Sequence, residues 1–212
     1  MKIIVLGTDE QQEEFRLKPF PDASEIFFLT DFNDLKSVPS AYIIFDLCFE
    51  PVPERIELLA AFNKPVLINS VVNTLKGLGL PENFIRINAW PGFLNRKIIE
   101  VATGFESQKA AAETIFQLLQ WPYQLSPDTP GMISARVIAM IINEAYFALG
   151  EGVSSKQEID VAMKLGTNYP LGPFEWGEKI GLKNIYKLLQ KLSSVSLRYS
   201  AAPLLEKEAL DK

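Results

Sequence analysis

Runs of apolar and β-branched residues recur through the first half of the chain, and each is followed by a polar segment. A strand covered on both faces of a parallel sheet is almost continuously apolar, so these runs predict buried strands. The runs span residues 2–7, 24–31, 40–49, 64–70 and 83–90, and helical or turn segments at 8–17, 31–38, 52–62 and 71–78 separate them. Strands that alternate with helices indicate right-handed crossovers in one parallel sheet. The pattern therefore predicts a small doubly wound, Rossmann-like domain over residues 1–104.

From Glu106 onward the apolar positions follow a helical period. The expected elements are a helix over 106–122 that Pro122 stops, a short strand and turn over 123–131, and helices over 132–152, 154–166, 171–181 and 182–194. Ser155 followed by Glu158 is a capping box, and Gly166 is the expected C-cap of that helix. The helix from residue 132 is apolar on more than one face, as expected at the centre of a bundle. We therefore expect a second, all-helical domain over residues 105–212.

Composition and charge narrow the class of protein. Hydrophobic residues make up 48% and charged residues 22% of the 212 positions, which is typical of globular domains. A net charge of −5 provides no basic stripe for phosphate backbones, so we expect no nucleic-acid partner. The first apolar run is too short for a signal peptide, and no run suffices to cross a bilayer, so we expect a cytoplasmic protein that does not bind membranes.

Cysteine and histidine usage excludes two kinds of site. The single cysteine, Cys48, cannot form an internal disulfide, and the absence of histidine removes the usual metal ligands. We therefore expect no metal. Cys48 lies in an apolar run, where a buried inert thiol is the expected state, because a nucleophilic thiol needs a nearby base.

Several short motifs in the second half occur together and in a fixed order. They are Asp128-Thr129-Pro130-Gly131, Asn143-Glu144-Ala145, Gly150-Glu151-Gly152-Val153, Ile159-Asp160 with residues 162–166, and Tyr169-Pro170 with Gly172-Pro173-Phe174-Glu175. In these motifs the segment 128–189 resembles the helical domain of the NAD-dependent 3-hydroxyacyl-CoA dehydrogenases. Residues 198–210 resemble the closing segment of that family, although the Gly-rich Phe-Tyr ending of active members is missing.

The resemblance continues more weakly in the first half, through residues 41–50, 67–72 and 88–101. That half is short for the family and lacks the helical insertion that usually follows the position of Asp31. The resemblance implies an α/β plus all-α fold, in which a small Rossmann-like parallel-sheet domain precedes a helical domain like the carboxy-terminal domain of 6-phosphogluconate dehydrogenase. It also implies NAD as the cofactor, an acyl-CoA-type ligand, and a homodimer formed through the helical domain.

Four catalytic positions of the family can be located in this chain. Residues 86–104 read as a strand that runs into a turn, with Asn88 and Glu100 twelve positions apart. In the family a His at the first position takes the hydroxyl proton and a Glu at the second holds that His. Asn88 replaces the His, and a carboxamide does not titrate in the useful range. Ser70 matches the Ser that hydrogen-bonds the substrate oxygen, and Ala135 replaces the Asn of the central helix.

Two of these positions keep a second interpretation. Ser70 is equally explained as a residue that closes a strand by bonding to local backbone. Glu100 is equally explained as a buried or interdomain carboxylate with a structural purpose.

The dinucleotide-binding loop is also altered. A dinucleotide fingerprint needs three glycines, and here only Gly7 is kept, with Asp9 and Gln12 at the second and third positions. Asp9 and Glu10 bring negative charge to the helix start where phosphate would lie. Asp31 ends the second strand, where an acid would accept from the adenosine ribose, although an Asp before a turn is common for local reasons.

Two hypotheses follow for function. The first is a shortened 3-hydroxyacyl-CoA dehydrogenase with weak NAD-linked activity, which uses Ser70 and Glu100, with water or Glu100 itself as the base in place of the usual His. The second is a non-catalytic relative that serves as a nucleotide or acyl-CoA sensor or as a dimeric scaffold. The sequence favours a protein that keeps the family fold but not the family's catalytic rate. The Gly and Pro residues that determine the fold survive in the second half, whereas polar catalytic positions are lost in the first.

Overall fold

The computed structural model describes residues 1–38 and 41–211. Within it the chain divides into two compact units, Met1–Met132 and Ile133–Lys212. The predicted strand 40–49 begins at Ser40, which lies outside the described residues.

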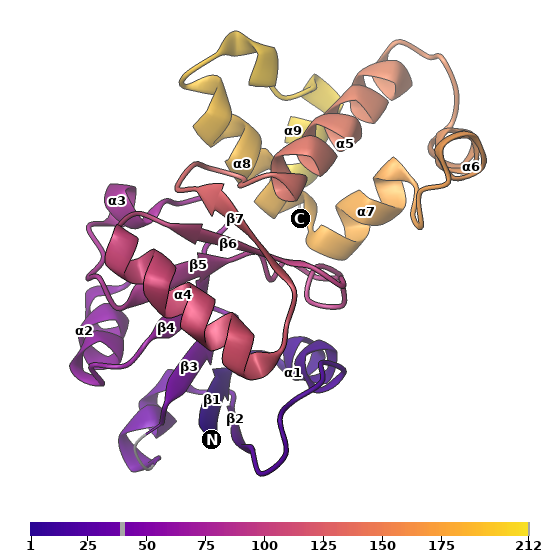
Figure 1. Cartoon of the computed structure of the whole chain (residues 1–212). Helices are drawn as coiled ribbons and strands as arrows, with labels where there is room; N and C mark the ends of the chain where they lie inside the picture. Colours follow the sequence, from indigo (N-terminus) through magenta and orange to yellow (C-terminus); the bar gives the residue numbers. More distant parts are fainter. Residues whose placement is uncertain (39–40, 212) are drawn as a thin grey trace. The chain divides into compact units, whose positions relative to one another are not determined.

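The first unit is built on one seven-stranded sheet with the order β2-β1-β3-β4-β5-β6-β7 (Figure 1). The strands are β1 Lys2–Leu6, β2 Glu25–Leu29, β3 Ile43–Asp46, β4 Val66–Asn69, β5 Phe84–Ile87, β6 Ile99–Thr103 and β7 Tyr123–Pro127. The first five are parallel to one another, β6 runs antiparallel to β5, and β7 is parallel to β6. The carboxyl ends of β1 to β5 therefore meet at one edge, where ligands of doubly wound sheets bind.

Helical segments cover both faces of this sheet. They are α1 Asp9–Arg16, η1 Phe32–Ser37, α2 Pro53–Ala61, α3 Leu75–Leu78 and α4 Glu106–Leu119. One core contains Phe15 of α1 and Ile115 and Phe116 of α4, and the other contains Leu35 of η1, Leu59 of α2 and Leu75 of α3. The central strands are buried on both faces, which accounts for their continuous apolar runs.

The second unit is helical. It contains α5 Ser134–Gly150, α6 Lys156–Thr167, α7 Pro173–Ile180, α8 Leu182–Ser193, η2 Leu197–Tyr199 and α9 Pro203–Leu210. Helix α5 packs against α7, α8 and α9, whereas α6 contacts α7. The buried Asn143 on α5 donates to Ser200 O and accepts from Ala202 N, which ties α5 to the start of α9. None of the helices in the described residues has both the length and the apolar character needed to cross a membrane.

The predicted fold class, α/β plus all-α, is confirmed, and three details differ from the prediction. Strand β6 was expected to be part of a turn. Helix α6 ends in the left-handed Asn168, with φ of 56°, rather than at Gly166. The expected domain boundary at residue 104 differs from the observed division after Met132, because β7 pairs with β6 and α4 packs on the sheet.

Candidate active site

The antiparallel pairing of β5 and β6 explains the spacing between Asn88 and Glu100. Ile87 pairs with Val101, so the next position along β5 lies opposite Glu100, and Asn88 N donates to Glu100 O at 3.1 Å. Both residues are almost fully buried, with exposed fractions of 1% and 7%. The twelve-residue separation of Asn88 and Glu100 therefore follows from the antiparallel pairing of β5 with β6.

The side chains of this pair face each other. Asn88 Nδ2 donates to Glu100 Oε2 at 3.3 Å, and Asn88 Oδ1 accepts from Trp90 N at 3.3 Å. The carboxamide thus lies against the carboxylate where the resemblance expects an imidazole. A carboxamide donates and accepts hydrogen bonds but neither takes up nor releases a proton near neutral pH. This arrangement can orient a polar group, but it cannot act as a general base through Asn88.

Ser70 lies at the same edge of the sheet. It follows β4 as Asn88 follows β5, and these strands pair in parallel with Asn69 opposite Ile87. The Ser70 hydroxyl donates to Asn73 O at 3.0 Å, which is a local backbone bond of the kind that closes a strand. Ala135, the fourth position, is fully buried on α5 and belongs to the second unit. Its methyl group offers no hydrogen bond.

Arg86, on β5 two residues before Asn88, holds the Ser70 segment in place. Its side chain is fully buried and donates to Ser70 O at 2.6 Å, Val71 O at 3.0 Å, Thr129 O at 3.3 Å and Asp128 Oδ1 at 2.6 Å. The guanidinium therefore fixes the turn after β4 to the segment after β7. Arg86 was not among the predicted site residues, although a lone Arg inside a buried strand requires buried partners and is a signal that the sequence contains.

Asp128 completes this buried network. Its Oδ1 and Oδ2 accept the N–H groups of Leu75 and Lys76 at 3.1 Å, at the start of α3. Burial lowers the pKa of Arg86, and the ion pair with Asp128 opposes that shift. One carboxylate thus caps a helix and balances the buried cation.

The start of α1 is satisfied by its own side chains. Gln11 Oε1 accepts Thr8 N at 3.0 Å, Thr8 Oγ1 accepts Gln11 N at 3.4 Å, and Gln11 Nε2 donates to Leu47 O at 2.7 Å. Gln11 also packs within 3.3 Å of a Cβ built on Gly7. A pyrophosphate at this helix start would need the N–H groups that the Thr8–Gln11 pair already occupies.

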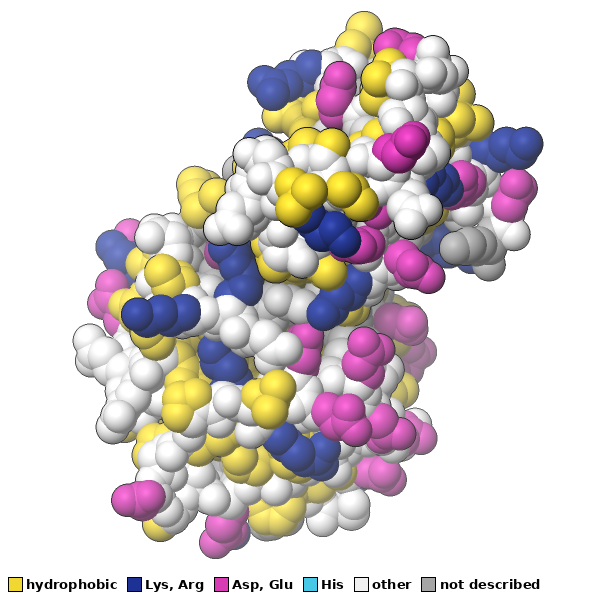
Figure 2. All heavy atoms as spheres, turned by 90° about the vertical axis from the view of Figure 1, so that its right-hand side faces the viewer, with side chains coloured by type: hydrophobic (Ala, Val, Ile, Leu, Met, Phe, Trp, Pro, Cys, Tyr) yellow, Lys and Arg dark blue, Asp and Glu magenta, His cyan; other side chains and the backbone are white. Residues whose placement is uncertain are grey.

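Gln12 fills the place of the third glycine of the fingerprint. It is 5% exposed, and Nε2 donates to Gly7 O at 2.9 Å and to Leu29 O at 3.0 Å. The exposed Asp9 and Glu10 add negative charge in the first turn of α1. Figure 2 faces the side on which α1 lies in Figure 1 and shows acidic side chains gathered on the surface of the first unit. The residues at this helix start do not fit a dinucleotide pyrophosphate.

Asn69 and Asp31 complete the edge. Asn69 Nδ2 donates to Leu47 O at 2.9 Å and to Ala89 O at 3.2 Å, while its Oδ1 accepts Ala89 N at 3.1 Å. Asp31 Oδ1 accepts Asn33 N at 2.8 Å and caps η1. Four carboxamides, those of Gln11, Gln12, Asn69 and Asn88, therefore bond to backbone groups of the segments at the carboxyl edge.

A second buried ion pair lies at the end of β3. Arg55 binds Asp46 through two hydrogen bonds of 2.7 and 2.6 Å, and Arg55 Nη2 lies 3.2 Å from Cys48 Sγ. Burial, followed by the charge of Asp46, raises the pKa of the Cys48 thiol. The thiol is therefore held in its unreactive protonated form. Among residues 1–38 and 41–211, no group of three His, Cys, Asp or Glu side chains could hold a metal ion.

Comparison with known proteins shows which family this chain resembles. A model of the family "3-hydroxyacyl-CoA dehydrogenase, C-terminal domain" matches residues 131–211. A 3-hydroxybutyryl-CoA dehydrogenase of Clostridioides difficile is 32% identical over 155 residues, covering 71% of this chain and 54% of the relative. A 3-hydroxyadipyl-CoA dehydrogenase of Escherichia coli is 49% identical over 85 residues, covering 39% of this chain and 18% of the relative.

A solved structure agrees in fold. The (S)-3-hydroxybutyryl-CoA dehydrogenase of Ralstonia eutropha superposes with a TM-score of 0.70 at 21% identity, over 97% of this chain and 92% of that one. By sequence, the chain spans about half the length of the Clostridioides relative. The family model, the curated relatives and the shared fold lead to one conclusion: the chain belongs to the 3-hydroxyacyl-CoA dehydrogenase family.

Proposed function

We propose that this protein keeps the fold of a 3-hydroxyacyl-CoA dehydrogenase while its NAD-linked oxidation of 3-hydroxyacyl-CoA is weak or lost. The observation that carries the proposal is the Asn88 carboxamide, which faces Glu100 at 3.3 Å where the family resemblance expects a histidine. Oxidation of a carbinol needs a group that accepts the hydroxyl proton as hydride leaves. The whole sequence contains no histidine that could take over this role.

The start of α1 supports the same proposal for the cofactor. The Thr8–Gln11 pair and Gln12 occupy backbone groups and space that a pyrophosphate would use. Asp9 and Glu10 would repel its charge. We therefore expect NADH to bind weakly or not at all.

The direct test measures NADH formation from NAD and 3-hydroxybutyryl-CoA, the substrate named for the Clostridioides relative. Loss of a positioned general base costs about 10²–10⁴ in rate, so we expect the wild-type chain to lie at least that far below an active dehydrogenase assayed in parallel. Turnover equal to that enzyme would overturn the proposal.

Two companion measurements separate the two defects. NADH titration followed by cofactor fluorescence reports binding alone, and saturable micromolar binding would contradict the cofactor part of the proposal. Asn88→His returns an imidazole beside Glu100 but leaves the α1 start unchanged. We therefore expect this variant to gain little activity unless Asp9→Gly and Gln12→Gly, at the second and third glycine positions, are added together with Gln11→Gly.

A second candidate function is a non-catalytic dimeric scaffold or acyl-CoA sensor. The observation that favours a dimer is the apolar outer surface of α6, where Val161 and Leu165 lie one turn apart with 44% and 83% of their surfaces exposed. A homodimer through the helical unit would bury them. We expect sedimentation velocity to show a dimer that Leu165→Glu dissociates and Gln157→Glu, an exposed substitution on the same helix, does not.

A further inference from the structure

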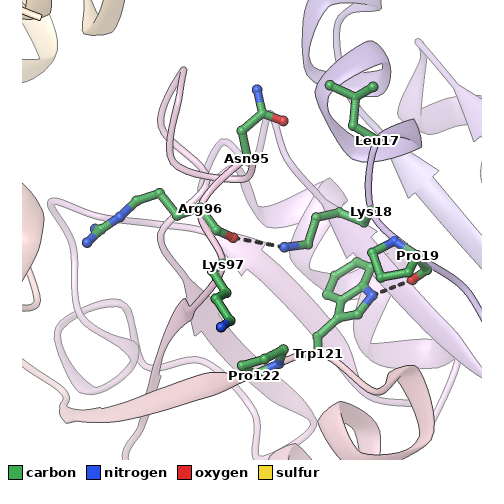
Figure 3. Close-up of a pocket in the computed structure, with 8 residues that line it drawn as sticks. All are labelled: Leu17, Lys18, Pro19, Asn95, Arg96, Lys97, Trp121 and Pro122. Carbon is green, nitrogen blue, oxygen red and sulfur yellow. Dashed lines mark hydrogen bonds between the residues drawn. The ribbon is translucent and has the colours of Figure 1, made fainter. Parts of the chain in front are cut away.

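The first unit contains a cavity of about 500 Å³ that the family reaction does not explain. Its walls come from residues 17–19 after α1, residues 95–97 between β5 and β6, and residues 121–122 between α4 and β7. Figure 3 shows how these three segments, distant in sequence, meet around it. The cavity is therefore a product of the fold.

Its walls are cationic and apolar. Lys18, Arg96 and Lys97 are among the eight lining residues and no Asp or Glu is, although the chain as a whole carries a net charge of −5. In Figure 3 the Lys18 side chain reaches toward the carbonyl of Arg96 and the Lys97 side chain runs down toward Pro122, while the Arg96 guanidinium points away from both. Two ammonium groups thus border the opening.

The hydrogen bond that Lys18 makes is to a neutral group. Its Nζ donates to the neutral carbonyl of Arg96 at 3.0 Å and lies 5.2 Å from the centroid of the Trp121 ring. Burial lowers the pKa of Lys18. Within the described part of the chain, neither Lys18 nor Lys97 forms an ion pair. An anion in the cavity would supply the missing countercharge.

The walls are also held in place before any ligand arrives. Trp121 Nε1 donates to Pro19 O at 2.6 Å, which joins two of the three segments. Glu14 Oε1 accepts Gly92 N at 2.6 Å and Asn95 Nδ2 at 3.3 Å, which fixes the loop between β5 and β6 to α1. Preorganised walls lower the entropic cost of binding.

We propose that this cavity binds a small phosphorylated ligand, with the phosphate between the ammonium groups of Lys18 and Lys97 and an apolar portion against Pro19 and Pro122. A phosphate monoester carries a charge of roughly −1.5 to −2 near neutral pH, which matches two cations better than a carboxylate does. The site does not use Asn88, Glu100 or the start of α1, so it is independent of the proposed loss of dehydrogenase activity.

The test uses phenyl phosphate as the probe and the indole N–H signals of the three tryptophans in a ¹H–¹⁵N spectrum of the full chain. We expect a saturable shift of the Trp121 signal, with inorganic phosphate competing for the same site. Lys18→Met combined with Lys97→Met removes both charge-assisted contacts, so we expect affinity to fall by about a hundredfold, roughly tenfold per lysine.

Lys36→Met, an exposed lysine on η1, is the matched control and should leave the affinity unchanged. The dispersion of the amide signals shows whether each variant is folded, and Lys97→Met alone provides a milder change on an exposed side chain. The proposal is overturned if the Trp121 signal does not saturate, if phenol produces the same shift, or if the folded double variant binds as tightly as the wild type.

Discussion

Gly172 precedes α7, and its backbone comes so close to Asp160 that no side chain fits between them. A Cβ at this position would lie 2.3 Å from Asp160 Oδ1 and 2.4 Å from its Cβ and Cγ. Asp160 is buried and accepts Phe174 N at 2.8 Å, so moving it aside would break a buried hydrogen bond. We predict that Gly172→Ala lowers the free energy of unfolding by about 2–4 kcal/mol, measured by urea denaturation.

Gly166 is the matched control for this change. It lies within α6, and a Cβ there would meet nothing within 4 Å. Because alanine restricts the unfolded chain more than glycine does, Gly166→Ala should raise the free energy of unfolding by about 0.4–1 kcal/mol. Equal effects of the two substitutions would contradict the close contact at Gly172.

Arg86 gives the second prediction at this scale. It is fully buried, and removing its guanidinium would leave Asp128 without its 2.6 Å ion pair and would remove the hydrogen bond of 2.6 Å to Ser70 O and that of 3.0 Å to Val71 O, which then keeps only its bond from Gly131 N. Breaking one partner of a buried pair typically costs about 3–5 kcal/mol. We expect Arg86→Met to lower the free energy of unfolding by that amount in urea denaturation.

The comparison for Arg86 is Lys64→Met, an exposed cation at the start of β4 that should change stability by less than about 0.5 kcal/mol. A double-mutant cycle with Asp128→Asn isolates the pair. If the loss of unfolding free energy in the double variant equals the sum of the losses in the two single variants, Arg86 and Asp128 are not coupled, and the proposed network is wrong.

Among the elements, the sequence predicted those whose apolar pattern is local and missed the one that depends on pairing. The first five strands have short apolar runs bounded by turn residues, and β7 lies in the short strand and turn predicted over 123–131, so each was expected. Strand β6 follows the loop that holds Pro91 and Gly92, and it becomes a strand by pairing with β5 and β7. A residue window cannot show that pairing. For the same reason the boundary was expected at residue 104 rather than after Met132, because the pairing of β7 with β6 cannot be read from the local sequence.

The candidate site was predictable to a similar extent. The spacing of Asn88 and Glu100 came from a motif, and the structure brings their side chains together. The roles of Gln11, Gln12 and Arg86 were missed because their partners, such as Leu47, Leu29 and Ser70, lie elsewhere in the sequence. Motifs can locate the positions at which this chain departs from the family pattern, but only tertiary contacts show what the substituted side chains bind.

Helix α6 provides a prediction about pH. Glu158 completes its capping box by accepting from the Ser154 and Ser155 hydroxyls and from Ser155 N, and these hydrogen bonds lower the pKa of Glu158 to about 2. A depressed carboxyl pKa stabilises the folded state above the ordinary value of 4.5. That contribution should fade as the pH falls from 4.5 toward 2.

Carboxyl chemical shifts and urea denaturation across this pH range check the prediction. Glu158→Gln should be less stable than the wild type at neutral pH, and the difference should shrink as the solution is acidified. Glu178→Gln, an exposed acid on α7, should show no such convergence. A wild-type Glu158 that titrates in the ordinary range would refute the capping contribution.

The two units of the molecule retain different parts of the family pattern. The family model matches residues 131–211, which include almost the whole helical unit, whereas the altered polar positions at the sheet edge lie in the first unit. A fold does not fix a function, so the match in the helical unit supports the architecture alone. The first unit holds the carboxyl edge of the sheet, where the carboxamides of Gln11, Gln12, Asn69 and Asn88 bond to backbone groups.

The division after Met132 gives the last prediction, which concerns the first unit as a folding unit. Residues 105–132 contribute α4, with Ile115, Phe116 and Leu119 in the core, and β7, which pairs with β6 along its length. They also supply Asp128 to the buried Arg86. A fragment of residues 1–132 should therefore unfold cooperatively in urea by circular dichroism. A fragment of residues 1–104 should show no cooperative transition, because it exposes β6 and one core face; an equally sharp transition in the shorter fragment would place the boundary at residue 104 after all.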